Sequence, residues 1–99
     1  MSKRTDADAR YVLVFTEHYN KRAARFLRLH PDLEMQYLKT LQLLEMNPQH
    51  PSLRLHALSV RLAGLHSVSI NLSYRITLEL LITESEIIPV NIGDHDAVY

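Results

Sequence analysis

Three residues in the last quarter of the chain have side chains that could act together on a phosphate ester. Arg75 lies in the segment SYRI, and His95 and Tyr99 lie in the final segment HDAVY. A guanidinium offers a planar pair of donors to phosphate, an imidazole transfers protons near neutral pH, and a tyrosine can orient a ligand or stack on a nucleobase. Each also has a plain structural interpretation: a solvated or Glu79-paired arginine, a loop histidine, and an apolar ring at the sheet edge.

Histidine is enriched in this sequence, with 6 copies in 99 residues. His56, in RLHAL, is a weaker candidate for proton transfer, and His66 has the parity of the core residues in its segment. His18, His30 and His50 are expected to be solvated on helix surfaces or in turns. No HxxxH or HExxH spacing occurs and the chain has no cysteine, so the sequence predicts neither a metal site nor thiol chemistry.

Composition excludes several classes of protein. The 11 basic and 11 acidic residues balance, so net charge gives no general support for binding nucleic acid. No apolar run is long enough to span a bilayer, and the N-terminal segment lacks the apolar stretch of a secretory signal. Glycine-rich phosphate loops and the GxSxG motif are absent from the sequence. We therefore expect a cytoplasmic protein with no membrane partner and no small-molecule cofactor.

The elements that would position these groups begin with a strand and two helices. Residues 1–9 are polar and are expected to form a flexible tail. The run RYVLVF, residues 10–15, is typical of a buried strand, and Thr16 is expected to cap a helix over residues 17–29. A second amphipathic helix should follow Pro31 and end at the segment NPQHP. The short connection predicts an antiparallel pair of helices.

Three strands are expected in the second half, after a mixed segment at residues 52–64. Apolar and polar residues alternate through HSVSINL and YRITLELLI, which predicts a β-hairpin, and IIPVNI predicts a third strand. Pro89 removes one ladder donor, so part of this strand should lie at an edge or a bulge. The alternation turns Arg75 away from the helices, onto the face that also carries Ser67, Ser69, Asn71 and Thr77.

The predicted fold is therefore α+β, in the order β-α-α-β-β-β. An antiparallel helix pair packs on one face of a small, mainly antiparallel sheet, because the apolar faces of both layers must be buried against each other. Residues 10–99 are expected to form a single domain that follows the tail.

This order of elements, with the segments GLHSVSINLSYRI and IGDHDAVY, resembles the RelE/ParE superfamily of toxins, and within it the YafQ-like and RelE-like ribonucleases. The resemblance covers residues 10–99. It implies the toxin of a type II toxin–antitoxin system, an endoribonuclease that cleaves messenger RNA at the ribosome without a metal and so inhibits translation. The implied partners are a cognate antitoxin, messenger RNA and the ribosome.

The resemblance also implies roles for individual residues. Arg75 matches the RelE-like arginine that contacts the scissile phosphate, and His95 and Tyr99 match the histidine and aromatic residue that close YafQ-like toxins. His56 resembles a YafQ-like histidine between the helices and the hairpin. Cleavage through the 2′-hydroxyl needs a base, a positive group and an acid, and we expect His56, Arg75 and His95 to supply them. Tyr99 would orient or stack the substrate, and further RNA contacts are expected from Arg61, Ser67, Ser69 and Asn71.

The sequence departs from both subfamilies. Ser67 and Ser69 stand where RelE-like toxins carry lysines, Ser73 stands where YafQ-like toxins carry an aspartate, and the net charge is neutral rather than basic. Two other functions therefore stay open: a ParE-like toxin that binds DNA gyrase, and a catalytically decayed member that only binds its antitoxin. The terminal histidine and tyrosine count against the gyrase binder, whereas the missing lysines favour the decayed member.

Overall fold

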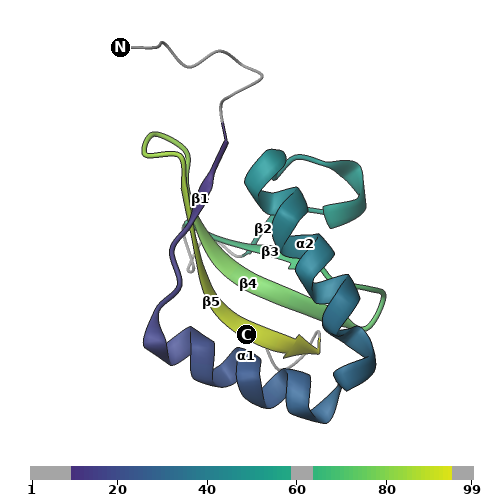
Figure 1. Ribbon diagram of the computed structural model, residues 1–99. Coiled ribbons are helices and arrows are strands. Elements are labelled where there is room, and N and C mark those ends of the chain that lie inside the picture. Colours follow the sequence, from purple (N-terminus) through teal and green to yellow (C-terminus); the bar gives the residue numbers. More distant parts are fainter. Residues whose placement is uncertain (1–9, 59–63, 95–99) are drawn as a thin grey trace.

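The computed structural model describes residues 10–58 and 64–94. In these ranges the chain forms one sheet with helices beside it (Figure 1). The expected tail, residues 1–9, lies outside the described residues. The elements, in order, are β1 (Val12–Leu13), α1 (Glu17–Leu29), the 3-10 helix η2 (Pro31–Leu33), α2 (Glu34–Met46), the 3-10 helix η3 (Pro51–Leu53), β2 (His56–Ala57), β3 (Leu65–Ser69), β4 (Tyr74–Leu81) and β5 (Glu86–Asp94).

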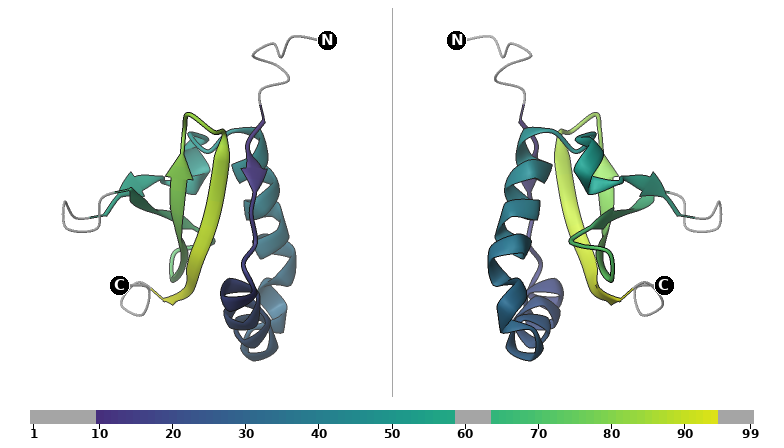
Figure 2. Two further views of the ribbon diagram at one scale, coloured as in Figure 1. Left: turned by 90° about the vertical axis from the view of Figure 1, so that its left-hand side faces the viewer. Right: turned by 90° about the vertical axis from the view of Figure 1, so that its right-hand side faces the viewer.

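The strands in the described ranges pair in the spatial order β1-β5-β4-β3-β2. β1 runs parallel to β5, with Val12 opposite Glu86, and the other neighbours pair antiparallel. α1 and α2 lie on one face of this sheet, and the chain turns between them at η2 (Figures 1 and 2). The predicted α+β class, with helices on one face of a mainly antiparallel sheet, is confirmed.

The core lies between the two helices and the sheet. Thr16 begins α1, because its hydroxyl accepts a hydrogen bond from the Tyr19 N–H at 3.1 Å. The apolar spacing of α1 then turns Tyr19, Ala23 and Phe26 inward. The sheet supplies the facing side chains, which include Val68, Ile70, Ile76, Leu78, Leu80, Ile87 and Ile92.

A buried pair of tyrosines joins the two helices. The hydroxyl oxygens of Tyr19 on α1 and Tyr37 on α2 lie 2.9 Å apart. Burial, and then the neighbouring Tyr37, raise the pKa of Tyr19, and burial likewise raises the pKa of Tyr37. Both hydroxyls therefore stay protonated in the folded protein, and each satisfies the other where water is excluded.

Two expectations about the strands were wrong in detail. The run at residues 10–15 was expected to be a buried strand, but β1 has only two residues, and Val12 and Phe15 are 58% and 43% exposed. The reason is its position, since β1 pairs only with β5 and lies at an edge of the sheet. Three strands were expected after the helices, but the described residues contain four, because the mixed segment at residues 52–64 includes β2, a two-residue strand at the opposite edge.

Pro89 lies at a bulge, one of the two placements expected for it. The register of β4 against β5 shifts between Thr77 and Leu78, where Leu78 faces Pro89. β5 is an interior strand, between β1 and β4, so the bulge accommodates the missing N–H. Within the described ranges, no helix is long and apolar enough to cross a membrane.

Candidate functional site

Arg75 lies on β4, on the sheet face opposite the helices. Its neighbour Ile76 is fully buried in the core, so the alternation along β4 turns Arg75 the other way. Across the sheet, Arg75 pairs with Ser69 of β3 on one side and with Gly93 of β5 on the other. A position in the middle of three hydrogen-bonded strands gives its guanidinium a rigid base.

Within residues 10–58 and 64–94, four polar groups contact the guanidinium of Arg75. Its Nε donates to Ser67 Oγ, and Nη1 donates to Ser69 Oγ at 2.8 Å. The remaining nitrogen, Nη2, lies 3.2 Å from the backbone oxygen of Arg54 and 3.2 Å from Nδ1 of His56. The serines hold the inner edge of the fork, whereas Nη2 lies among exposed groups at the surface.

The two serines expected to bind RNA are buried beneath this arginine. Ser67 is 0% exposed and Ser69 is 8% exposed. The alternation placed both on the outer face, where they lie, but it could not show that a long side chain from the next strand lies across them. Their hydroxyls now accept hydrogen bonds from Arg75, so their expected contact with RNA stays a prediction and would require that side chain to move.

His56 lies at the exposed edge of the same face, on β2, opposite Ser67 of β3. Guanidinium nitrogens only donate, so the contact from Arg75 requires Nδ1 of His56 to accept, with the imidazole proton on Nε2. Nδ1 also lies 3.4 Å from the backbone oxygen of Arg54, a contact that needs the proton on Nδ1 instead. The two contacts are alternatives, one for each tautomer. The structure thus brings His56 and Arg75 together, as two of the four predicted catalytic residues.

Arg54 belongs to the site and was not identified from the sequence. Its backbone is left-handed, with φ 50° and ψ 48°, a conformation that residues with a Cβ adopt at some cost. This conformation ends η3 and turns the Arg54 carbonyl toward Arg75. The only available signal was the spacing in R-L-H, which puts Arg54 and His56 on the same side of an extended segment.

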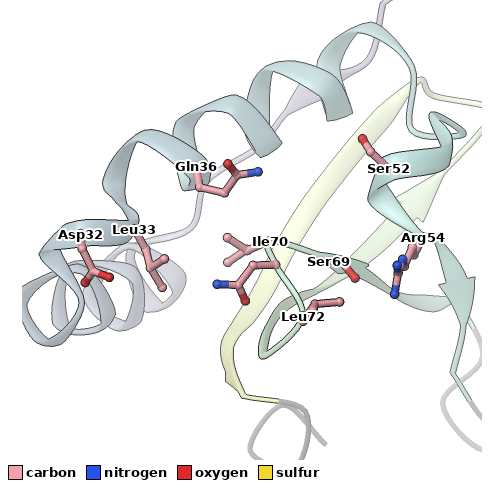
Figure 3. A pocket seen from close by; sticks show the side chains of 9 residues that line it. Asp32, Leu33, Gln36, Ser52, Arg54, Ser69, Ile70 and Leu72 are labelled. Atoms are coloured by element: carbon pink, nitrogen blue, oxygen red, sulfur yellow. The ribbon is translucent and has the colours of Figure 1, made fainter.

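A hollow of about 520 Å³ adjoins the arginine network. It lies between the start of α2, η3 and the β3–β4 turn (Figure 3). Asn71, one of the predicted RNA contacts, shapes its turn, because Asn71 Oδ1 accepts from the N–H groups of Ser73 and Tyr74, each at 2.8 Å. The lining residues are Asp32, Leu33, Gln36, Ser52, Arg54, Ser69, Ile70, Asn71 and Leu72.

Two other described histidines, His66 and His30, contact other groups. His66 is half-buried, with Nδ1 3.3 Å from the Gly64 oxygen. His30 was expected to be solvated, but it is half-buried between Phe26 and Tyr74, with both ring centroids 4.7 Å from its own. The end of α1 packs against β4 there, which the helix pattern alone could not show. In residues 10–58 and 64–94, no three potential ligands among His, Asp and Glu gather as a metal site.

Three predicted site residues, Arg61, His95 and Tyr99, lie outside the described residues. Their roles stay predictions. The last described residues bear on this end of the chain, since Gly93 pairs with Arg75 and Asp94 with Tyr74. β5 therefore ends beside the arginine at the centre of the site.

Comparison with known proteins rests on structure alone. No protein-family model and no curated protein matches the chain. Among solved structures, YafQ from Escherichia coli is similar with a TM-score of 0.67 at 16% identity, covering 90% of this chain and 98% of that one. A YoeB/ParE toxin from Agrobacterium tumefaciens has a TM-score of 0.70 at 14% identity, covering 85% and 98%.

Toxin–antitoxin complexes are among the similar structures. The E. coli DinJ–YafQ toxin–antitoxin complex matches with a TM-score of 0.66 at 16% identity, covering 90% of this chain and 97% of the matched chain. The RelBE2 toxin–antitoxin complex of Mycobacterium tuberculosis matches with a TM-score of 0.54 at 18% identity, covering 87% and 99%. The architecture expected from the resemblance is thereby confirmed, and the chain shares its fold with these toxin structures.

Proposed function

We propose that this chain is the toxin of a type II toxin–antitoxin system and that it cleaves messenger RNA at the ribosome. The observation that carries the proposal is the contact between the Arg75 guanidinium and Nδ1 of His56, 3.2 Å apart on the sheet face opposite the helices. A cation that can bind a phosphate and an imidazole that can transfer a proton thus lie close enough to contact the same phosphate group.

The alternative contacts of His56 suggest how substrate would activate the pair. When a phosphate draws Nη2 of Arg75 to itself, Nδ1 of His56 loses its donor and can hold the proton against the Arg54 oxygen, 3.4 Å away. That tautomer leaves the lone pair on Nε2, which is the form a general base needs. Nε2 then takes the proton of the 2′-hydroxyl while the 2′-oxygen attacks phosphorus.

The remaining steps fall to residues predicted from the sequence. Arg75 stabilises the charge that develops on the phosphate oxygens. His95 donates a proton to the departing 5′-oxygen, and Tyr99 orients or stacks the substrate. The products would be a 2′,3′-cyclic phosphate on one fragment and a 5′-hydroxyl on the other. A small cognate antitoxin protein would neutralise the activity.

Expression in bacteria tests this proposal. The chain is produced with and without the small reading frame beside its gene, growth is followed, and RNA ends are mapped. We expect translation arrest and new RNA ends only without the partner, and their loss in Arg75→Ala and His56→Ala. The matched controls are Arg28→Ala and His18→Ala, which remove the same residue types from exposed positions on α1.

Two results would redirect the assignment. Filamentation and a DNA-damage response without RNA cleavage would indicate the gyrase-binding alternative. Normal growth with retained antitoxin binding would indicate a decayed toxin. One feature of the site favours the decayed toxin. Groups of the described part of the chain already contact every nitrogen of the Arg75 guanidinium, and a phosphate would have to displace some of them.

A further inference from the structure

The hollow beside Arg75 has no part in the cleavage steps described above. Its volume of about 520 Å³ is within the range of small-ligand sites. Two of its lining residues, Ser69 and Arg54, also bind the Arg75 guanidinium. A ligand whose phosphate lies at Arg75 would therefore extend its neighbouring group into this hollow.

Opposite charges mark the two ends of the hollow. Figure 3 shows Asp32 at the end formed by η2 and Arg54 at the other end, beyond η3, with Leu33 and Ile70 between them. A nucleotide has the matching polarity, because its phosphate is anionic and its base presents hydrogen-bond donors. The apolar side chains between the two ends suit the faces of a base.

The donors and acceptors of the hollow can be assigned. Asn71 Oδ1 accepts from two backbone N–H groups, those of Ser73 and Tyr74. Its two lone pairs are therefore used, and only the Nδ2 hydrogens remain for a ligand. The carboxylate of Asp32, by contrast, can only accept. The hollow thus offers a fixed donor on the β3–β4 turn and a two-oxygen acceptor at η2.

We propose that this hollow binds the base next to the scissile phosphate and prefers guanine. The inference rests on the proposed function, which puts the phosphate at Arg75. Guanine presents two adjacent donor groups, N1–H and the N2 amino group, that match the two oxygens of Asp32, and its O6 and N7 acceptors match an amide donor such as Asn71. No other RNA base offers two adjacent donor groups to a carboxylate.

Binding of RNA that cannot be cut tests the inference apart from catalysis. Short fluorescent oligonucleotides carry a 2′-deoxy residue at the scissile position and each of the four bases on either side of it. Anisotropy gives the affinity of the full chain and of Asp32→Asn, Asn71→Asp and Glu84→Gln. Asn71→Asp keeps the oxygen that holds the turn, and Glu84→Gln removes the same charge as Asp32→Asn from the exposed β4–β5 turn.

We expect the guanine oligonucleotide to bind tightest, and its advantage to fall about tenfold in Asp32→Asn and in Asn71→Asp, as for loss of a bidentate base contact. Glu84→Gln should keep the preference. Equal affinity for all four bases would overturn the inference, even if Arg75→Ala abolishes cleavage and the proposed function stands. A guanine preference in a protein that cuts no RNA would support the inference and contradict the proposed function. If Asp32→Asn weakens antitoxin binding and leaves RNA binding unchanged, the hollow is a peptide site and the inference fails.

Discussion

Removing the hydroxyls that hold Arg75 should slow RNA cleavage while the arginine itself stays in place. Ser69→Ala deletes the acceptor of Nη1 at 2.8 Å, and Ser67→Ala deletes the acceptor of Nε. Both serines are buried, so water does not readily replace the lost oxygen. In each variant the guanidinium keeps its contacts with His56 and the Arg54 oxygen, but one side of the fork becomes free to turn.

The size of the effect follows from the kind of bond that is lost. A hydrogen bond to a charged group contributes about 1.5–3 kcal/mol, and about 1.4 kcal/mol corresponds to a factor of ten in rate. We therefore expect cleavage by Ser69→Ala to slow by about 10- to 100-fold. The double variant should lose less than the product of the two single effects, because both serines hold the same guanidinium.

Steady-state and single-turnover kinetics on a defined RNA measure this effect, with urea unfolding alongside. A positioning role predicts a fall in kcat with little change in KM, and recovery in Ser69→Thr, which restores a hydroxyl on a strand that favours β-branched residues. Unchanged cleavage by Ser67→Ala/Ser69→Ala, with unfolding at the same urea concentration as the unmodified protein, would refute this account of how Arg75 is held.

Three further predictions concern stability. Tyr19→Phe should lower the free energy of unfolding by about 1–3 kcal/mol, since it leaves the buried Tyr37 hydroxyl without its partner. In urea titrations, Tyr19→Phe/Tyr37→Phe should lose less free energy of unfolding than the two single variants together. Additive losses would contradict the pairing. The folded protein raises both tyrosine pKa values above the ordinary 10.0, so their contribution to stability is complete below pH 10 and is lost above it. The loss for Tyr19, whose pKa is raised far above 10, should be about 1.4 kcal/mol per pH unit. Thermal melts from pH 9 to 11 should show this loss, and the double phenylalanine variant should lack it. Arg54→Gly should have a higher free energy of unfolding than Arg54→Ala by about 1 kcal/mol, because only glycine adopts φ 50° without cost. Equal free energies of the two variants in urea titrations would contradict a strained Arg54.

Local patterns in the sequence were sufficient to predict the elements whose buried faces follow a regular apolar spacing. Thr16 and the inward spacing of Tyr19 and Phe26 predicted α1, and alternation predicted both the hairpin and the outward direction of Arg75. Pro89 predicted an irregular ladder, which the bulge at Thr77–Leu78 confirms.

The details of the site depend on contacts between segments far apart in the chain. Nothing near Ser67 in the sequence shows that the side chain of Arg75, 8 residues later, lies across it. Likewise, β2 has only two residues and forms because β3 offers it an edge, and the left-handed Arg54 is held by a carbonyl contact with a residue 21 positions away. Such features arise from tertiary structure, which single-segment patterns do not encode.

We propose above all that Arg75 and His56 act together on a phosphate within RNA. The most direct measurement is the cleavage rate of purified protein on a defined RNA, with chemical identification of the new ends. We expect a 2′,3′-cyclic phosphate and a 5′-hydroxyl, and rates that fall by about 10²- to 10³-fold in Arg75→Ala and His56→Ala, while Arg28→Ala cuts normally. Cleavage by Arg75→Ala and His56→Ala at the unmodified rate would contradict it.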